Sequence, residues 1–182
     1  MATFRRVLTP GATYFFTVNT YRRQPVLTQS PVYQALKTSV RAVMQAHPFT
    51  IEAFVLLPDH LHCIWALPDG DADYARRWNI IKRLVSQQVR HLISPMTSGS
   101  RARRGELGLW QRRFWEHQIR DERDFEKHVE YIHWNPVKHG YTKTVIEWPY
   151  SSFHRFAARG IYPADWAGDG SLEGEGVYGE PV

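Results

Sequence analysis

The pattern of apolar and polar residues predicts strands and helices that alternate along most of the chain. Runs rich in aromatic and β-branched residues predict strands at 11–21, 49–57, 60–67 and 110–119. Apolar residues spaced three and four apart predict helices over about 30–47, 75–93 and 121–135, the last one ended by Pro136 and Gly140. This order is that of an α+β, ferredoxin-like antiparallel sheet (a split βαβ unit) with an added C-terminal helix that bears a tyrosine. We expect helices to cover one face of the sheet and to leave the other face to a ligand.

The composition changes near Gly160. Five acidic residues and no Lys or Arg lie between Gly160 and the end of the chain. We therefore expect one folded domain, residues 1–159, followed by an acidic, flexible tail, residues 160–182. No apolar run is long enough to span a membrane, and the first residues lack the order of a secretory signal. A single cysteine, Cys63, excludes an intramolecular disulfide, and we expect a cytoplasmic protein with no membrane partner.

The charge distribution indicates the kind of partner. The chain carries 23 Lys and Arg against 18 Asp and Glu, a formal net charge of +5. Because all of the basic residues but only 13 of the acidic ones precede Gly160, residues 1–159 carry +10. A basic body with 14% aromatic residues favours a polyanion whose bases or sugars can stack. A solvated basic surface would give the same composition and remains the alternative.

Two histidines lie close together in the third predicted strand, in the sequence His60-Leu61-His62. Side chains alternate along a strand, so both imidazoles project from one face, while Leu61, Cys63 and Trp65 project from the other. Two imidazoles about 7 Å apart at their backbone positions can hold one divalent ion. A polar sheet face without a ligand is the alternative.

The last predicted helix carries a polar arc beside its apolar one. Helical spacing places Phe125, Val129 and Ile132 on one arc, and His128, Tyr131 and Asn135 on its neighbour. Because Tyr131 and Asn135 are one turn apart, their side chains can reach the same point. Ordinary packing of a half-buried tyrosine beside a solvated asparagine is the alternative.

Basic residues line the second predicted helix and recur after it. Arginines beside aromatic residues suit single-stranded or hairpin nucleic acid, because guanidinium groups bind phosphates and aromatic faces stack on bases. The core also needs aromatic residues, so we expect fewer than half of the neighbouring ones to touch a ligand: Trp78, Trp110, Phe114 and Trp115. The candidate DNA-binding residues are Arg76, Lys82, Arg83, Arg90, Arg101, Arg103, Arg104, Arg112 and Arg113.

The ordered combination of these features resembles the HUH single-tyrosine DNA-nicking enzymes, in particular the REP-associated tyrosine transposases and their insertion-sequence relatives. The resemblance rests on HLH within LLPDHLHCIW, on YIHWNPVKHG in the last helix, and on WPYSSF after it. It extends to YFFTVNTYRRQPVLT and NIIKRLVSQQVRHLI and covers about residues 10–156. The sequence departs from the family at Asp59, where Asn is often found before the first histidine, and in the segment 95–109, to which we can assign no family role.

The resemblance implies a role for each candidate residue. His60, His62 and Asn135 match the metal ligands, with Mg²⁺ or Mn²⁺ as the ion, and Tyr131 matches the nucleophile. The implied reaction cleaves and rejoins single-stranded or hairpin DNA through a covalent 5′-phosphotyrosine, without ATP. His128, one turn before Tyr131, is a candidate for the general base or for a phosphate contact.

Two other functions fit parts of this pattern. One is a protein that binds hairpin or single-stranded nucleic acid without cleaving it, and the other is a metal-dependent nuclease that forms no covalent adduct. The complete set of two histidines, a tyrosine and an asparagine argues against a protein that only binds. The oligomeric state is left open between a monomer and a homodimer.

Overall fold

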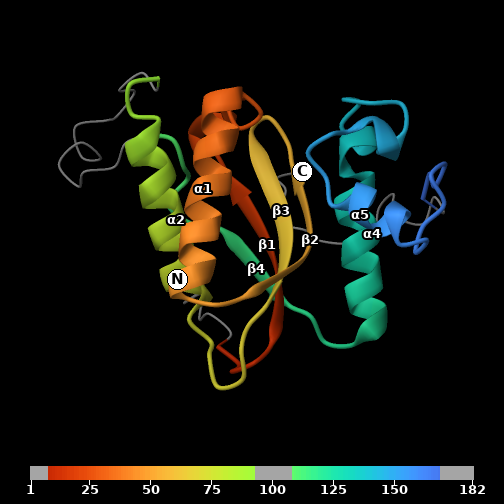
Figure 1. The fold of residues 1–182 in the computed structure, drawn as a ribbon, viewed down its shortest axis with the longest axis horizontal. Helices are drawn as coiled ribbons and strands as arrows, with labels where there is room; N and C mark the ends of the chain where they lie inside the picture. The colour runs from red at the N-terminus through yellow and green to blue at the C-terminus, as the bar shows by residue number, and fades with distance from the viewer. Residues whose placement is uncertain (1–7, 93–107, 169–182) are drawn as a thin grey trace, which may run out of the picture.

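The computed structural model describes residues 8–92 and 108–168 (Figure 1). Its strands are β1 (Thr13–Asn19), β2 (Thr50–Leu56), β3 (His60–Ala66) and β4 (Trp115–Gln118). Its helices are α1 (Ser30–Ala46), α2 (Tyr74–Gln88), α4 (Glu122–Lys138) and α5 (Phe153–Ala158), with short 3-10 helices at Tyr21–Arg23 and Val145–Glu147. Neighbouring strands are antiparallel, in the order β2-β3-β1-β4. The predicted α+β, ferredoxin-like sheet is confirmed.

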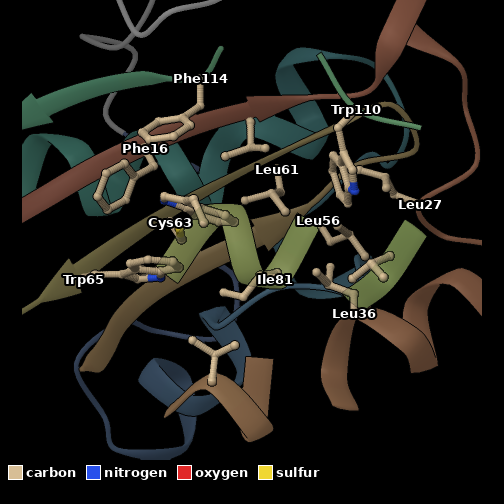
Figure 2. Packing of buried hydrophobic residues seen from close by; sticks show 14 of the residues in the cluster. Phe16, Leu27, Leu36, Leu56, Leu61, Cys63, Trp65, Ile81, Trp110 and Phe114 are labelled. Atoms are coloured by element: carbon tan, nitrogen blue, oxygen red, sulfur yellow. The ribbon is translucent and has the colours of Figure 1, made fainter. Parts of the chain in front are cut away.

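The alternation of side chains along β3 separates two cores. Helices α1 and α2 pack on one face of the sheet (Figure 1). Leu61, Cys63 and Trp65 join the apolar cluster on this face (Figure 2), as the alternation predicts. Burial there raises the pKa of the Cys63 thiol well above its ordinary value, so this cysteine is part of the core.

Helix α4 covers the second face of the sheet, which we expected to be left to a ligand. Val129 and Ile132, from the predicted apolar arc, are buried together with Phe15 of β1 and Ile64 of β3. Removing these apolar groups from water favours the docking of α4 onto the sheet. The histidines of β3 therefore face a helix.

The prediction that α4 ends at Asn135 is wrong, because the helix continues through Pro136 to Lys138. Pro136 lacks the N–H that would donate to the preceding turn, so the helix continues through it without that one bond. Beyond Lys138, the last helical residue, the chain turns at Gly140, whose φ of 70° few other residues adopt readily. The N–H of Tyr141 donates to the carbonyl of Pro136 at 2.9 Å, which closes the last turn.

Strand β4 is shorter than the predicted segment 110–119. Its four residues pair with β1, whereas Trp110 makes an isolated bridge to Thr20. Between them the chain leaves the ladder, and the ring of Phe114 is buried against Phe16 and Trp78. This ring lies in the α1–α2 core while Trp115 packs on the α4 side, so the alternation of side chains extends to Phe114 although the backbone pairing begins at Trp115.

The segment before α5 runs along the outer edge of β2. The N–H of Leu56 donates to the carbonyl of Tyr150, and the N–H of Ser152 donates to the carbonyl of Phe54, both at 2.9 Å. Val55 and Ser151 form a bridge between these two bonds. Backbone groups at the edge of the sheet are thereby paired within the same chain.

The residues that follow α5 pack against it. The rings of Tyr162 and Trp166 lie 6.0 and 5.9 Å from the ring of Phe153. The segment 160–182, predicted as a flexible tail, therefore begins with residues that contact the folded body, and 169–182 lie outside the described residues. The boundary at residue 159 stays a prediction. Within the described ranges, no helix is long and apolar enough to span a membrane.

We expect Ser152→Ala to lower the free energy of unfolding by about 2 kcal/mol. The Ser152 hydroxyl accepts a bond from the N–H of Phe54 at 2.9 Å, donates to the carbonyl of Phe54 at 3.1 Å, and lies 3.0 Å from Nε2 of His133. Burial and the charge of Arg155 lower the pKa of His133 to about 3, so its neutral ring would be left with a buried, unmatched N–H.

Urea unfolding of the two variants Ser152→Ala and Thr38→Ala measures this difference. The Thr38 hydroxyl is exposed and bonds to the carbonyl of Gln34 in its own helix, so its loss should change stability by less than about 0.5 kcal/mol. Equal stability of the two variants would contradict the assigned role of Ser152.

Candidate active site

His60 and His62 lie on the face of β3 that α4 covers. Their ring centroids are 4.9 Å apart. Tyr131 of α4 reaches the same place, with its ring centroid 5.2 Å from that of His62 and 6.2 Å from that of Phe15. The Tyr131 side chain is only 1% exposed. The structure thus brings the predicted nucleophile and two predicted metal ligands together.

Asn135 lies between two residues of α4 that contact the histidine pair. Tyr131, one turn earlier, packs against His62, and His139, one turn later, has its ring centroid 5.3 Å from that of His60. Residues four apart share one face of a helix. The predicted third ligand is therefore buried on the side of α4 where the two imidazoles lie.

Each imidazole is oriented by a hydrogen bond at its Nδ1 atom. Nδ1 of His60 lies 2.7 Å from the carboxylate of Asp59, and Nδ1 of His62 lies 2.8 Å from the hydroxyl of Thr17. With Nδ1 engaged in both rings, Nε2 is the atom that can face an ion. Such contacts behind the ligands fix the tautomer and the orientation of metal-binding histidines.

Asp59, the departure from the family pattern, is held as a carboxylate. Burial raises its pKa, but the hydrogen bond from His60 and the positive charge of Arg23 outweigh burial, so the pKa lies below its ordinary value. Arg23 Nε lies 2.8 Å from the second carboxylate oxygen. Because a carboxylate only accepts, Nδ1 of His60 carries a proton and Nε2 carries the lone pair. A carboxylate at this position therefore suits a metal-binding His60.

The donor set fits a divalent ion. Two imidazole nitrogens and one amide oxygen can be supplied by His60, His62 and Asn135, all of them buried. Imidazole favours borderline ions such as Mn²⁺, whereas Mg²⁺ prefers oxygen ligands. On donor chemistry alone, Mn²⁺ suits this set better than Mg²⁺ does.

Lys138, which the sequence analysis did not single out, contacts Tyr131. Its Nζ donates to the Tyr131 hydroxyl at 3.2 Å and lies 4.7 Å from the centre of the tyrosine ring. The two residues are seven apart, two turns on the same face of α4. The sequence shows this spacing, but the helix was predicted to end at Asn135, so Lys138 was not placed on the same helix as Tyr131.

His128 belongs to a network at the start of α4. Its Nδ1 lies 2.7 Å from the carbonyl of Asp124, and its ring stacks on His117 at 4.7 Å and packs against Phe15 at 4.8 Å. Burial lowers its pKa, which favours a neutral ring. The predicted role of His128 as a base or phosphate contact stays a prediction.

A second group of metal-ligating side chains comes together there. The ligand atoms of His117, Asp124 and His128 lie within 4.8 Å of one another. The Asp124 carboxylate is already bonded to Nε2 of His117 at 2.8 Å, and to the backbone N–H and Nε of Arg120, both at 3.0 Å. These bonds make Asp124 the anchor of the turn into α4, where its backbone N–H is capped by Asp121 at 2.8 Å.

Four of the predicted DNA-binding residues line one hollow. It has a volume of about 680 Å³, lies between α2 and residues 108–112, and is lined by Lys82, Arg83, Arg90 and Arg112. Lys82 is nearly buried and donates to the carbonyl of Gln111 at 2.7 Å, so it also joins the two segments. Arg76 and Arg113 are exposed and do not line this hollow. Arg101, Arg103 and Arg104 fall outside the described residues.

The aromatic residues near these cations belong mostly to the core. Trp78, Trp110 and Phe114 are buried, and Trp115 is half-buried. This agrees with the expectation that fewer than half of them touch a ligand.

Comparison with known proteins identifies the family. The family described as "Transposase IS200 like" matches residues 10–135. The REP-associated tyrosine transposase of Escherichia coli (strain K12) is 46% identical over 169 residues, which cover 93% of each chain. The chain therefore belongs to the IS200-like transposases, in the branch of the REP-associated tyrosine transposases.

A solved structure agrees with this assignment. The "REP associates tyrosine transposase bound to a REP hairpin" superimposes with a TM-score of 0.81 at 44% identity. The match covers 100% of this chain and 99% of that one. At this identity and coverage the likeness extends beyond the fold to the sequence of the whole chain.

We expect Asp124→Asn to lower the free energy of unfolding by about 2 kcal/mol at neutral pH. Burial raises the pKa of Asp124, but hydrogen bonds from Arg120 and His117 outweigh it and hold the pKa far below its ordinary value. A carboxyl with a depressed folded-state pKa stabilises the protein above its unfolded-state pKa, and this contribution is lost as the pH falls through the folded-state pKa.

Denaturant unfolding at several pH values measures the effect. The difference between wild type and Asp124→Asn should be constant from about pH 7 to 5 and should shrink below about pH 4. Glu126→Gln removes an exposed carboxylate from the same helix and should have little effect. A difference that does not change with pH would contradict the assignment.

Proposed function

We propose that this protein is a metal-dependent DNA strand transferase that cleaves and rejoins single-stranded or hairpin DNA through a 5′-phosphotyrosine. The observation that carries the proposal is the contact of the Tyr131 ring with the His60–His62 pair across the interface of α4 and β3. A hydroxyl nucleophile beside a pair of imidazoles that can hold a metal ion is an arrangement suited to phosphoryl transfer to a protein side chain.

In the proposed reaction, the hydroxyl oxygen of Tyr131 attacks the scissile phosphorus. The phenol gives up its proton to a base as the bond between its oxygen and phosphorus forms. The bond from phosphorus to the 3′-oxygen breaks, and the 3′-oxygen takes up one proton and leaves as a hydroxyl. A divalent ion held by His60, His62 and Asn135 would neutralise and orient the phosphate when bound. Because a phenol is more acidic than an alcohol, with a pKa of about 10, the phosphotyrosine keeps enough reactivity for another 3′-hydroxyl to reverse the step.

Lys138 stabilises the nucleophile in this reaction. An ammonium at 3.2 Å from the Tyr131 oxygen stabilises the negative charge that develops on this oxygen as the phenol loses its proton. The same cation can contact the phosphate that approaches this oxygen. For the general base we keep His128, the candidate from the sequence analysis, as a prediction.

The proposed substrate is a DNA hairpin with single-stranded flanks. The solved relative is described as bound to a REP hairpin, and this chain matches it over its whole length. The hollow lined by Lys82, Arg83, Arg90 and Arg112 supplies cations for the phosphates of such a strand. We propose that Arg76 and Arg113, which are exposed and close to these residues in the sequence, also bind phosphates of the DNA. The same role is proposed for Arg101, Arg103 and Arg104.

We expect Tyr131→Phe to abolish covalent protein–DNA adducts and to leave DNA binding unchanged. The substitution removes the attacking oxygen and keeps the ring that packs against His62 and Phe15. The measurement is a denaturing gel of labelled hairpin oligonucleotides with Mn²⁺, beside a binding titration. Tyr33→Phe, on α1 at the opposite sheet face, should form adducts as the wild type does.

The same gel separates the alternatives. Adducts that persist in Tyr131→Phe would contradict the assignment of the nucleophile. A wild-type protein that binds hairpins tightly and forms no adduct would favour a binding protein, and cut DNA without any adduct would favour an ordinary nuclease.

We expect Lys138→Met to slow adduct formation about a hundredfold, because it removes a donor to the oxygen on which charge develops. Lys138→Arg keeps the charge and should restore part of the rate. The measurement is a single-turnover time course at saturating DNA, so that changes in affinity do not enter. Equal rates for Lys138→Met and the wild type would show that this contact has no role in the reaction.

A further inference from the structure

A group of aromatic side chains lies beside the histidine pair, where α4 ends. The ring of His139 is 5.3 Å from that of His60 and 6.1 Å from that of Tyr141. Tyr141 in turn stacks on Trp148, with centroids 5.4 Å apart and planes 30° apart. The rings therefore continue without a break from a proposed metal ligand to the surface. Neither the sequence analysis nor the proposed reaction assigns them a role.

Tyr141 presents an aromatic surface to solvent that the fold holds in place. Its side chain is 43% exposed, although its ring also stacks on a tryptophan. The turn at Gly140 fixes its backbone, since its N–H closes the end of α4. Trp148, behind it, is fixed by a hydrogen bond from Nε1 to the carbonyl of Leu56 at 2.9 Å. The stacked rings of Tyr141 and Trp148, the Tyr141–Trp148 platform, are thus held in place by the fold itself.

The charges around this platform favour a polyanionic ligand. Arg23 and Asp59 form an ion pair at 2.8 Å beside His60, the histidine at the inner end of this row of rings. Burial raises the pKa of Tyr141, the charge of Asp59 raises it further, and the charge of Arg23 lowers it.

Lys138 and Lys143, both exposed, precede and follow Tyr141 in the chain. Glu147, which accepts bonds from the backbone N–H groups of Lys143 and Thr144, is a second carboxylate in this region. Three cations against two carboxylates leave a net positive charge among these residues, which suits a nucleotide whose base stacks on the exposed ring while its phosphate contacts a cation.

We propose that the Tyr141–Trp148 platform is a stacking subsite for an unpaired base of the DNA strand that flanks the scissile phosphate. This inference rests on the proposed function, because it is the proximity of His60 that places the subsite next to the reacting phosphate. The exposed side of the Tyr141 ring receives the base, Trp148 supports the ring from the other side, and His139 separates this contact from the metal ligands. The subsite holds the strand in position for cleavage.

The experiment uses the full chain and a DNA hairpin with short single-stranded flanks that carry one 2-aminopurine at each flank position in turn. We expect one flank position at which wild-type protein quenches the fluorescence, as stacking on an aromatic ring does. Tyr141→Ala should lose this quenching and bind the flanked hairpin about tenfold more weakly, with little change for the same hairpin without flanks. Tyr141→Phe keeps the ring and should behave as the wild type.

Controls separate this inference from misfolding and from the proposed chemistry. Ile161→Ala removes an exposed apolar side chain elsewhere and should change neither signal, and a thermal melt of Tyr141→Ala should match the wild type. Quenching that survives in Tyr141→Ala, or equal affinity of the wild type for flanked and unflanked hairpins, would overturn the subsite. Tyr131→Phe should keep the quenching without forming adducts. Quenching that depends on Tyr141 in a wild type that forms no adducts would support the subsite and overturn the strand-transfer proposal.

Discussion

The docking of α4 onto the histidine-bearing face of the sheet is the interaction on which the rest of the candidate site depends. Val129 and Ile132 are buried against Phe15 and Ile64, and this apolar contact fixes both the rotation and the height of the helix. Helical spacing then determines where the polar residues of α4 lie relative to the sheet. Tyr131 comes against the imidazoles only because neighbouring residues of the same helix are held in a hydrophobic contact.

Polar contacts orient the two imidazoles that α4 covers. Asp59 and Thr17 bond to the Nδ1 atoms of His60 and His62, so each ring is fixed from the side away from an ion. Arg23 balances the charge of Asp59, which keeps a buried carboxylate from being an isolated charge. The site therefore joins residues from β1, from the β2–β3 turn, from β3 and from α4, and no single segment contains its chemistry.

Periodicity in the sequence was sufficient to predict the sheet, the side-chain faces of β3 and the polar arc of α4. It failed where tertiary contacts decide. Pro136 suggested a helix end, yet the helix continues to Lys138, and the contact of Lys138 with Tyr131 was therefore missed. The strand expected over 110–119 pairs with β1 only over Trp115–Gln118, while Trp110 bridges to Thr20, and alternation of side chains does not report where backbone pairing breaks. Contacts of Asp59 with Arg23 join residues distant in the sequence, and no local pattern reports them.

The pairing of residues 150–152 with β2 also limits how this chain can associate with others. An unpaired edge strand is a template to which a strand of a second molecule can add. Along Phe54–Leu56 that template is already filled by the chain's own backbone. A continuous sheet between two copies at this edge would first need the segment before α5 to detach. Intermolecular strand addition there is therefore opposed by bonds that the folded chain has already made.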